Sequence, residues 1–344
     1  MLGQHLSQNG AKEAKGGLPR GKTTEIYGPP GVGKTAFGLS AAASALRAGH
    51  NVVWVDCGTP LVRKRLGDIL HGAPQGDTQE SSLTEKSGTG SEQLQSNLIH
   101  LTAPTLPHVL ALFLHPMPNF PPPDTALIVL DSLSTAFDTA FHTRSSSKPH
   151  AQKTDVEKWA SNRRFAVQGA LAGALNAAAA VRDAAVLVTG QTATQVRSAQ
   201  GALLVPALAG AEWDAGIANR VVLFRDWPPN DVVCLGQDRE RWARLRYAGV
   251  LKVNGVGQGE DGLFATVVPF SVETDGLREL EVPGEKMAGG MSASPVRAKK
   301  RSFVEIADSD DEFDDYGWDE EDELAAEGLI VDESLLRAEK TAKG

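Results

Sequence analysis

One short segment has the residue types and the spacing of a phosphate-binding loop. Its glycines let the backbone turn so that N–H groups converge on phosphate oxygens, and a following helix adds a favourable dipole. In the pattern G-x-x-x-x-G-K-[ST], Lys34 is expected to hold the β- and γ-phosphates of a nucleoside triphosphate, and Thr35 to bind Mg²⁺. The residues that we assign to the nucleotide in this loop are Gly28, Pro29, Pro30, Gly31, Val32, Gly33, Lys34 and Thr35.

A carboxylate at the end of an apolar run is the second candidate. Residues 126–130 are all apolar and Asp131 follows them, which is the pattern of a central parallel strand covered on both faces. Asp131 is therefore expected to bind the same Mg²⁺ as Thr35, directly or through water. The alternative interpretation, a merely glycine-rich turn and an aspartate that caps a strand, stays open.

The loop needs a strand before it and a helix after it, and the hydrophobic pattern predicts both. Strand 24–27 leads into the loop, helix 36–48 leaves it, and strand 51–56 follows. These elements predict an α/β fold, with a mostly parallel central sheet flanked by helices and a C-terminal β extension. Further helices are predicted at 106–114 and 156–181, a buried strand at 185–189, β-rich segments at 220–225, 232–235, 244–253 and 263–272, and loops at 72–98, 115–124 and 142–154.

Charge divides the chain unevenly. The net charge is -9, but residues 305–344 hold 16 acidic and 3 basic side chains, so the remainder is mildly basic. We predict a flexible arm over 1–16, a folded core over 17–284, and a disordered acidic tail over 285–344. The basic cluster 299–301 in this tail is typical of a nuclear import signal, although an inert tail is the alternative. No apolar run approaches the roughly 18 residues that span a bilayer, so no membrane partner is expected.

Several segments, in order along the chain, resemble the eukaryotic RecA-type recombinases and, more closely, their paralogues. The resemblance implies a RecA-like P-loop NTPase core, ATP and Mg²⁺ as cofactors, and a Gln191 that senses the γ-phosphate. It implies a protein that assists recombinase filaments on single-stranded DNA in homologous recombination and double-strand break repair, and the basic cluster 299–301 predicts a nuclear location. The expected partners are the main recombinase, a second paralogue in a heterodimer, and weakly bound DNA. The segments that carry it are 17–35, 126–136, 185–191, 206–225 and 270–277.

The chain departs from this family where active recombinases have a water-activating glutamate. Asp56 is retained, but Cys57, Gly58 and Thr59 stand at the expected place. Without a general base the loop can still bind ATP, whereas hydrolysis is expected to be slow or to depend on a partner. Asp56 is a weak alternative candidate for that base. A polymerisation element of the Phe-x-x-Ala type is also lacking in the first sixteen residues, which favours a defined heterodimer over long filaments.

Two segments that face the filament axis in the resembled family are candidate DNA contacts. Both are predicted to be loops, one after Asp131 and the other over 192–205. Aromatic residues that could stack on bases are not expected in either. For these two segments, the alternative is an ordinary solvated loop without a DNA contact. For the chain as a whole, the alternative function is that of a RecA-folded subunit in an Elongator-type tRNA-modifying assembly. The candidate DNA-binding cations are Arg144, Lys148, Lys153, Arg163, Arg164 and Arg197.

Overall fold

The computed structural model divides the chain into two units, Met1–Met291 and Ser292–Gly344. All described residues belong to the first unit, so the acidic run and the basic cluster lie outside them. Within the described elements, nothing is assigned to the side chains of 155–158, 195–197 and 201–203. The residues described are 17–58, 60–61, 63–72, 94–141, 155–197, 201–226, 244–258 and 266–280.

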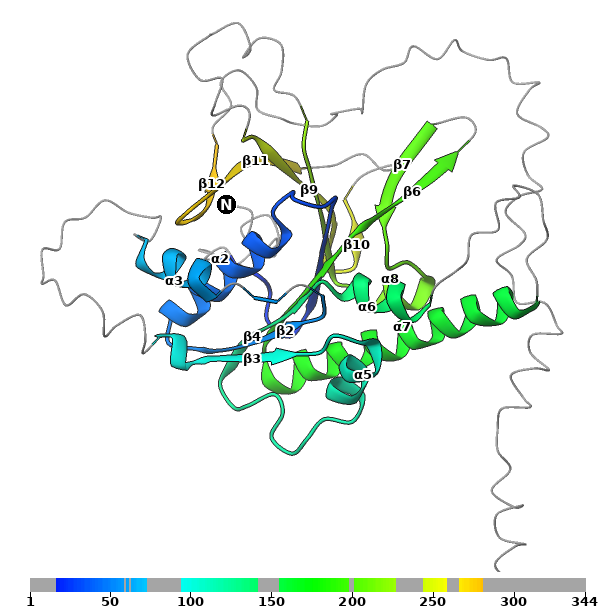
Figure 1. Ribbon diagram of the computed structural model, residues 1–344, viewed down its shortest axis with the longest axis horizontal. Helices are drawn as coiled ribbons and strands as arrows, with labels where there is room; N and C mark the ends of the chain where they lie inside the picture. Colours follow the sequence, from blue (N-terminus) through cyan, green and yellow to red (C-terminus); the bar gives the residue numbers. More distant parts are fainter. Residues whose placement is uncertain are drawn as a thin grey trace, which may run out of the picture. The chain divides into compact units, whose positions relative to one another are not determined.

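A parallel sheet forms the centre of the first unit (Figure 1). Neighbouring strands in it are far apart in sequence, because each parallel pair needs a crossover connection. The order across the sheet is β8 (Asn219–Phe224), β1 (Thr23–Tyr27), β5 (Ala185–Gly190), β4 (Thr125–Asp131), β2 (Asn51–Asp56) and β3 (Leu98–Thr102). The carboxyl ends of β1, β4, β2 and β5 therefore meet at one edge, where ligands of open α/β sheets bind.

The sheet continues beyond β8 with antiparallel strands, which is the expected C-terminal β extension. Strand β9 (Arg246–Val253) pairs with β8, and β11 (Thr266–Glu273) pairs with β9. The last strand, β12 (Gly276–Glu279), pairs with β11, and the short β10 (Val256–Gly257) pairs with β9. Two of these pairs, β9 with β10 and β11 with β12, are joined by two-residue turns, which only antiparallel neighbours allow.

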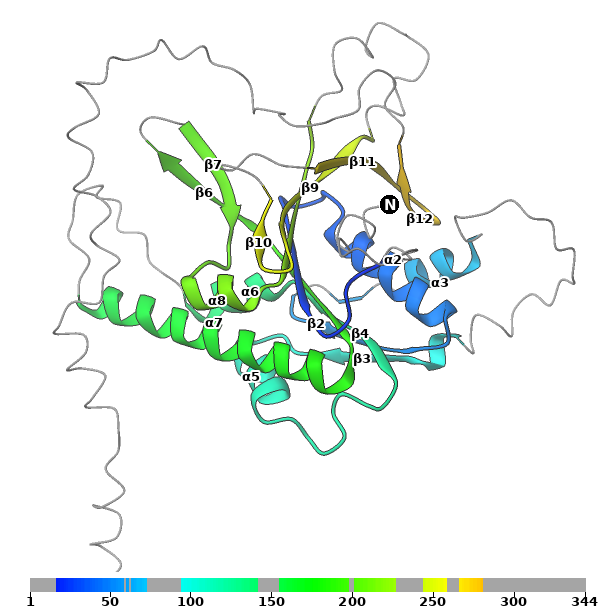
Figure 2. The same cartoon turned by 180° about the vertical axis from the view of Figure 1, so that it is seen from behind.

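Helices cover both faces of the sheet, as the two opposite views show (Figures 1 and 2). Helices α2 (Lys34–Arg47) and α3 (Arg63–His71) pack with Ile26, Trp54 and Val129 in one buried cluster. The other face is covered by α5 (Leu106–Leu114), α6 (Leu133–Ala140), α7 (Asp155–Arg182) and α8 (Ala211–Gly216). Because both faces are covered, β4 and β5 are apolar over most of their length instead of alternating. Strand β1 is an exception, since Thr23, Thr24 and Glu25 are buried polar residues.

The described helices and strands agree with most of the predicted ones, and helix 106–114 was predicted with the observed bounds. Helices α3 and α6 and strand β3 were not predicted, since their short apolar patterns are interrupted by polar residues. Strand β3 begins inside the segment 72–98, which was expected to be wholly an insertion. The predicted strand at 232–235, the loop at 142–154 and residues 73–93 lie outside the described residues.

The segment 192–205 was predicted to be a loop, and this prediction was wrong. Strands β6 (Thr192–Arg197) and β7 (Gly201–Pro206) pair antiparallel as a separate two-stranded sheet. Their backbone donors and acceptors are satisfied by bonds between the two strands.

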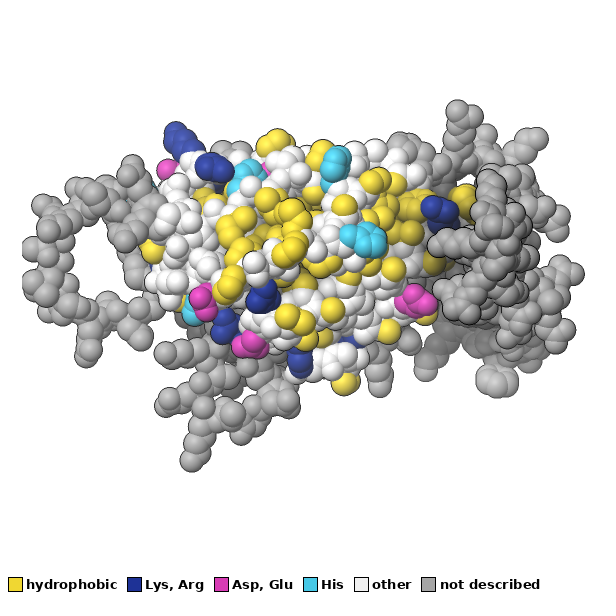
Figure 3. Space-filling model, turned by 90° about the horizontal axis from the view of Figure 1, so that it is seen from below, with side chains coloured by type: hydrophobic (Ala, Val, Ile, Leu, Met, Phe, Trp, Pro, Cys, Tyr) yellow, Lys and Arg dark blue, Asp and Glu magenta, His cyan; other side chains and the backbone are white. Residues whose placement is uncertain are grey.

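Apolar side chains also remain on the surface. Seen from below, hydrophobic side chains gather across the middle of the face on which α5 and α7 lie (Figure 3). Leu114, Met117 and Val181 are among the exposed large side chains. Within the described part of the chain, no helix combines the length and the apolar character needed to cross a membrane.

Candidate functional site

The glycine-rich loop connects β1 to α2 at the carboxyl edge of the sheet. A Cβ at Gly28 would lie 2.3 Å from the carbonyl oxygen of Leu223, so no larger residue fits there. Gly33 has a φ of 112° in the left-handed region, where a side chain is strained. A Cβ at Gly31 would meet nothing within 4 Å. The loop thus follows the sheet closely at one end and borders open space at its tip.

Lys34 is the first residue of α2, and its side chain folds back under the loop. Its Nζ donates to the carbonyl oxygens of Gly28 and Pro29, at 2.7 and 3.0 Å, and to Oε1 of Gln191 at 3.2 Å. Burial lowers the pKa of this ammonium, whereas the nearby Asp131 carboxylate acts to raise it. The lysine therefore holds its ammonium group against the start of the loop and within reach of Gln191.

Asp131 lies at the end of β4, where two hydroxyl groups converge on its carboxylate. Thr35 Oγ1 donates to Oδ2 at 2.8 Å, and Thr189 Oγ1 donates to Oδ1 at 2.5 Å. Burial raises the pKa of the Asp131 carboxyl, although both hydroxyls act to lower it. A buried carboxylate next to an exposed threonine hydroxyl is a ligand pair that suits Mg²⁺, which prefers oxygen ligands. Thr35 and Asp131 were predicted from the sequence, whereas Thr189 was not, because its position in the apolar strand 185–189 was its only signal.

Gln191 directly follows β5 and joins the loop to the β6–β7 hairpin. Its side-chain oxygen accepts from Lys34, and its backbone N–H donates to Ser134 Oγ at 2.9 Å. Its carbonyl accepts from the backbone N–H of Ala207, just after β7. Gln191 thus contacts Lys34 through its side chain, and through its backbone it joins the residue before β6 to the residue after β7.

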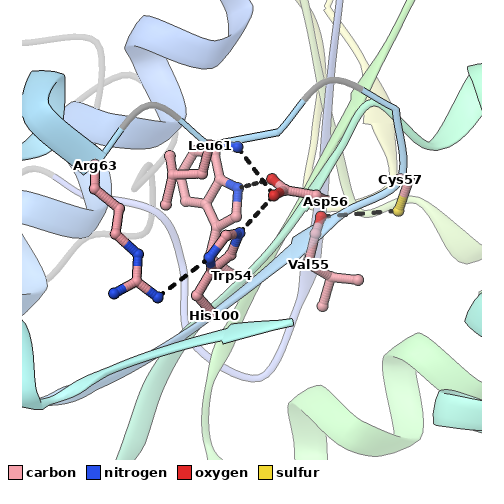
Figure 4. Close-up of polar contacts among 7 residues, drawn as sticks. All are labelled: Trp54, Val55, Asp56, Cys57, Leu61, Arg63 and His100. Atoms are coloured by element: carbon pink, nitrogen blue, oxygen red, sulfur yellow. Dashed lines mark hydrogen bonds and ion pairs between the residues drawn. The ribbon is translucent and has the colours of Figure 1, made fainter. Parts of the chain in front are cut away.

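Asp56 lies at the end of β2, beside Asp131 in the sheet register. It accepts three hydrogen bonds: from Trp54 Nε1 at 2.9 Å, from the backbone N–H of Leu61 at 2.9 Å, and from His100 Nε2 at 2.5 Å (Figure 4). Arg63 Nη2 lies 3.5 Å from the other ring nitrogen of His100, and arginine can only donate. This contact places the imidazole proton on Nε2, towards Asp56.

The position of the missing glutamate is occupied by a short turn after Asp56. Cys57 is buried, and burial raises the pKa of its thiol to about 12, so it stays a neutral thiol. Gly58 is exposed, and a Cβ built there would lie 3.6 Å from the side chain of Thr135, an ordinary contact distance. A side chain at position 58 would therefore have space near the Asp131 end of β4.

The candidate DNA-binding cations differ in their environments. Arg163 is exposed and its guanidinium lies 5.3 Å from the centre of the Trp159 ring. Trp159 is 61% exposed, which corrects the expectation that aromatic residues are lacking there. Arg164 instead donates to Asp138 and to the carbonyl of Ala207, both at 3.1 Å, and so ties α6 to the base of the hairpin. The positions outside the described side chains are Arg144, Lys148, Lys153 and Arg197.

Comparison with known proteins agrees with this arrangement. The DNA repair protein rhp55 of Schizosaccharomyces pombe is 24% identical over 328 residues, which cover 84% of this chain and 88% of that protein. The chain is RecA-like. The RecA protein of Zymomonas mobilis is 43% identical to it over 75 residues, about a fifth of each chain.

A solved structure and the family models complete the comparison of this RecA-like chain. The crystal structure of the RadB recombinase has a TM-score of 0.49 and 18% identity, and the match covers 77% of this chain and 94% of that one. No protein-family model matches the chain.

Proposed function

We propose that this chain binds ATP with Mg²⁺ and assists the assembly or stabilisation of a recombinase filament on single-stranded DNA, in homologous recombination and double-strand break repair. The observation that carries the nucleotide part is the convergence of Lys34, Gln191, Thr35 and Asp131 on one loop. The similarity to a DNA repair protein over most of both chains supports the recombination part.

The residues present fit Mg²⁺ and a triphosphate. The open space at Gly31 leaves room for phosphate oxygens against the backbone N–H groups of the loop. Lys34 would hold the β- and γ-phosphates, and Thr35 and Asp131 would hold the ion, which stabilises the charge of the phosphates when bound. Gln191 would sense the γ-phosphate, since it already contacts Lys34 and the base of the hairpin.

Slow hydrolysis follows from the residue types at 57–59, where no glutamate stands. The oxygens of Asp56 accept three donors and the residue is 2% exposed, so it is poorly placed to take a proton from water. Gly58 has no side chain to do so. We therefore propose an ATP-dependent assembly factor, in which nucleotide binding and not turnover controls the state of the protein.

The partners and the cellular location belong to the same proposal. We expect a heterodimer with a second recombinase paralogue, contact with the main recombinase, weak binding to single-stranded DNA, and a nuclear location directed by residues 299–301. The arm at 1–16, the core at 17–284 and the tail at 285–344 stay a prediction. Deleting 299–301 is expected to move a fluorescently tagged protein out of the nucleus, and an unchanged distribution would mean that a partner imports it.

Nucleotide binding is tested by titrating MgATP into the purified chain by calorimetry. Lys34→Ala removes the charge that meets the phosphates and is expected to lower the affinity by at least about a hundredfold. Lys22→Ala is a matched control, because that lysine contacts Asn254 and not the loop. Equal affinities of the Lys34 and Lys22 variants would remove the site assignment.

The recombination part needs a separate experiment. The tagged chain is purified from its own cells, and the copurifying proteins are identified by mass spectrometry, with the Lys34→Ala variant in parallel. We expect a recombinase and a second paralogue to copurify with the unaltered chain. If assembly needs ATP, smaller amounts of both should copurify with Lys34→Ala. Recovery of tRNA-modification subunits instead would leave the fold and the site in place but would overturn the recombination role.

A further inference from the structure

Two arginines outside the loop motif border the phosphate loop. Arg225 follows β8, is exposed, and donates from Nη2 to the carbonyl oxygen of Gly31 at 3.1 Å. Arg246 opens β9, and its Cδ lies 3.9 Å from the point where a Cβ of Gly33 would stand. The two arginines thus border the loop, Arg225 at its exposed tip and the half-buried Arg246 beside Gly33, whereas Lys34 contacts the carbonyl oxygens at its start.

This position is electrostatically unfavourable without an anion. Burial lowers the pKa of Arg246, and repulsion from Arg225 and from Arg65 on α3 lowers it further. Glu273 opposes the repulsion, but it lies 3.5 Å from Arg244 Nη1. Like charges held close together destabilise a fold unless a ligand or a counter-ion offsets them.

The hydrogen bonds of Arg246 also leave part of its guanidinium without a partner. Nη1 donates to the carbonyl of Arg244 at 2.9 Å, whereas the buried Nε has no partner among the described residues. A buried donor without a partner costs free energy, which a phosphate oxygen at this border would recover.

We propose that Arg225 and Arg246 form a second cationic subsite, which contacts the phosphate groups of the bound nucleotide from the outer border of the loop. This inference rests on the proposed function, because the ligand is the same nucleotide. The loop motif alone places the phosphate site within residues 28–35. The proposed subsite adds Arg225, which follows β8, and Arg246, the first residue of β9. A protein without a water-activating glutamate would retain its triphosphate for longer with this additional charge.

The test compares MgATP and adenosine binding by calorimetry, at several KCl concentrations, for Arg225→Gln and Arg246→Gln. Each substitution is expected to weaken MgATP binding about tenfold, the loss of one charge-assisted hydrogen bond. The dependence of the affinity on salt should become shallower, because fewer charges meet the phosphates. Adenosine, which has no phosphate, should bind equally to all variants.

Arg244→Gln is the matched control, because Arg244 lies two residues from Arg246 and contacts Glu273. If the glutamine variants at 225 and 246 bind MgATP as the 244 variant does, the inference is wrong. A weakening that is equal for MgATP and adenosine, with unchanged salt dependence, would mean that the arginines only brace the loop, and would also overturn it.

Folding of the variants is checked by circular dichroism. If Arg246→Gln does not fold, Arg225→Gln decides alone, since Arg225 is exposed, and Arg225→Lys should recover part of the affinity. Failure of the unaltered chain to bind MgATP would overturn the proposed function itself. Normal binding by the unaltered chain with no effect of the arginines would overturn only this inference.

Discussion

Thr35 Oγ1 and Asp131 Oδ2 are hydrogen-bonded at 2.8 Å, although 96 positions separate the two residues in the sequence. The bond joins the first turn of α2 to the end of β4, and Thr189 of β5 donates to the other carboxylate oxygen. Three elements therefore hold the oxygen ligands in place before any ion arrives. Such preorganisation lowers the cost of binding.

Removing the carboxylate should remove the magnesium dependence of nucleotide binding. Asp131→Asn keeps the size of the side chain but lacks the charge that attracts Mg²⁺. ATP affinity of the unaltered chain should fall at least about tenfold when EDTA replaces Mg²⁺, whereas the variant should show nearly the same low affinity in both conditions. Asp138→Asn is the control, because Asp138 is half exposed and contacts Arg164. A variant that still responds to Mg²⁺ would place the ion elsewhere.

Asp131 also predicts a pH dependence of stability. Its folded-state pKa is raised above the ordinary value of 3.8, mainly by burial, so the folded chain holds this proton more tightly than the unfolded chain does. The contribution of this group to the free energy of unfolding is then present below about pH 3.8 and is lost as pH rises through the folded pKa.

Thermal unfolding without Mg²⁺ measures this effect. Asp131→Asn should be more stable than the unaltered chain at neutral pH, and the difference should shrink as the pH falls towards about 4. Addition of MgATP should reverse the order, since only the carboxylate attracts the ion. A difference that does not change with pH would show that another group accounts for it.

A glutamate at position 58 should raise the rate of ATP hydrolysis. The position is exposed and a Cβ there makes only ordinary contacts with Thr135, so the variant is expected to fold. General-base catalysis contributes about 10² to 10⁴ in rate when the base reaches the attacking water. Gly58→Gln has the same size and no base, and a release assay for phosphate compares the two. Equal rates would mean that the missing glutamate does not limit hydrolysis.

Asp56→Ala should unfold the protein more readily without acting on the phosphates directly. The substitution leaves the buried donors of Trp54 and Leu61 and the partly buried donor of His100 without their shared acceptor. This loss is expected to cost about 3 kcal/mol. Urea denaturation measures the loss. Asp138→Ala removes a half-exposed ion pair and should cost less than about 1 kcal/mol. A loss below 1 kcal/mol for Asp56→Ala would contradict a stabilising role of these three hydrogen bonds.

Arg163 and Arg164 should respond differently to substitution. Arg163→Gln is expected to weaken single-stranded DNA binding and to make that binding less sensitive to salt. Little change in stability is expected, because Arg163 is exposed and its guanidinium lies beside Trp159. Arg164→Gln loses its bonds to Asp138 and Ala207 and should lower thermal stability instead. Fluorescence anisotropy with a labelled oligonucleotide and thermal unfolding separate the two effects. The interpretation of Arg163 fails if DNA binding is unchanged.

Local sequence patterns were sufficient to predict the helices and strands whose apolar residues form a clear run or period. The apolar run before Asp131 could only be a covered strand, and the prolines after Leu114 could only end a helix. Strand β3 could not be recognised in the same way, because its side chains are only partly buried at the edge of the sheet. The β6–β7 hairpin depends on pairing between segments that have weak patterns of their own.

The sequence by itself determined the phosphate loop, the carboxylate at the end of its strand and the absence of a glutamate at position 58, because spacing and residue type define these features locally. Only the tertiary structure decided that Thr189 contacts Asp131, that Asp56 braces a turn, and that Arg225 and Arg246 border the loop. The physical reason is that a parallel sheet brings together the carboxyl ends of strands that are distant along the chain. No local pattern records which side chains meet there.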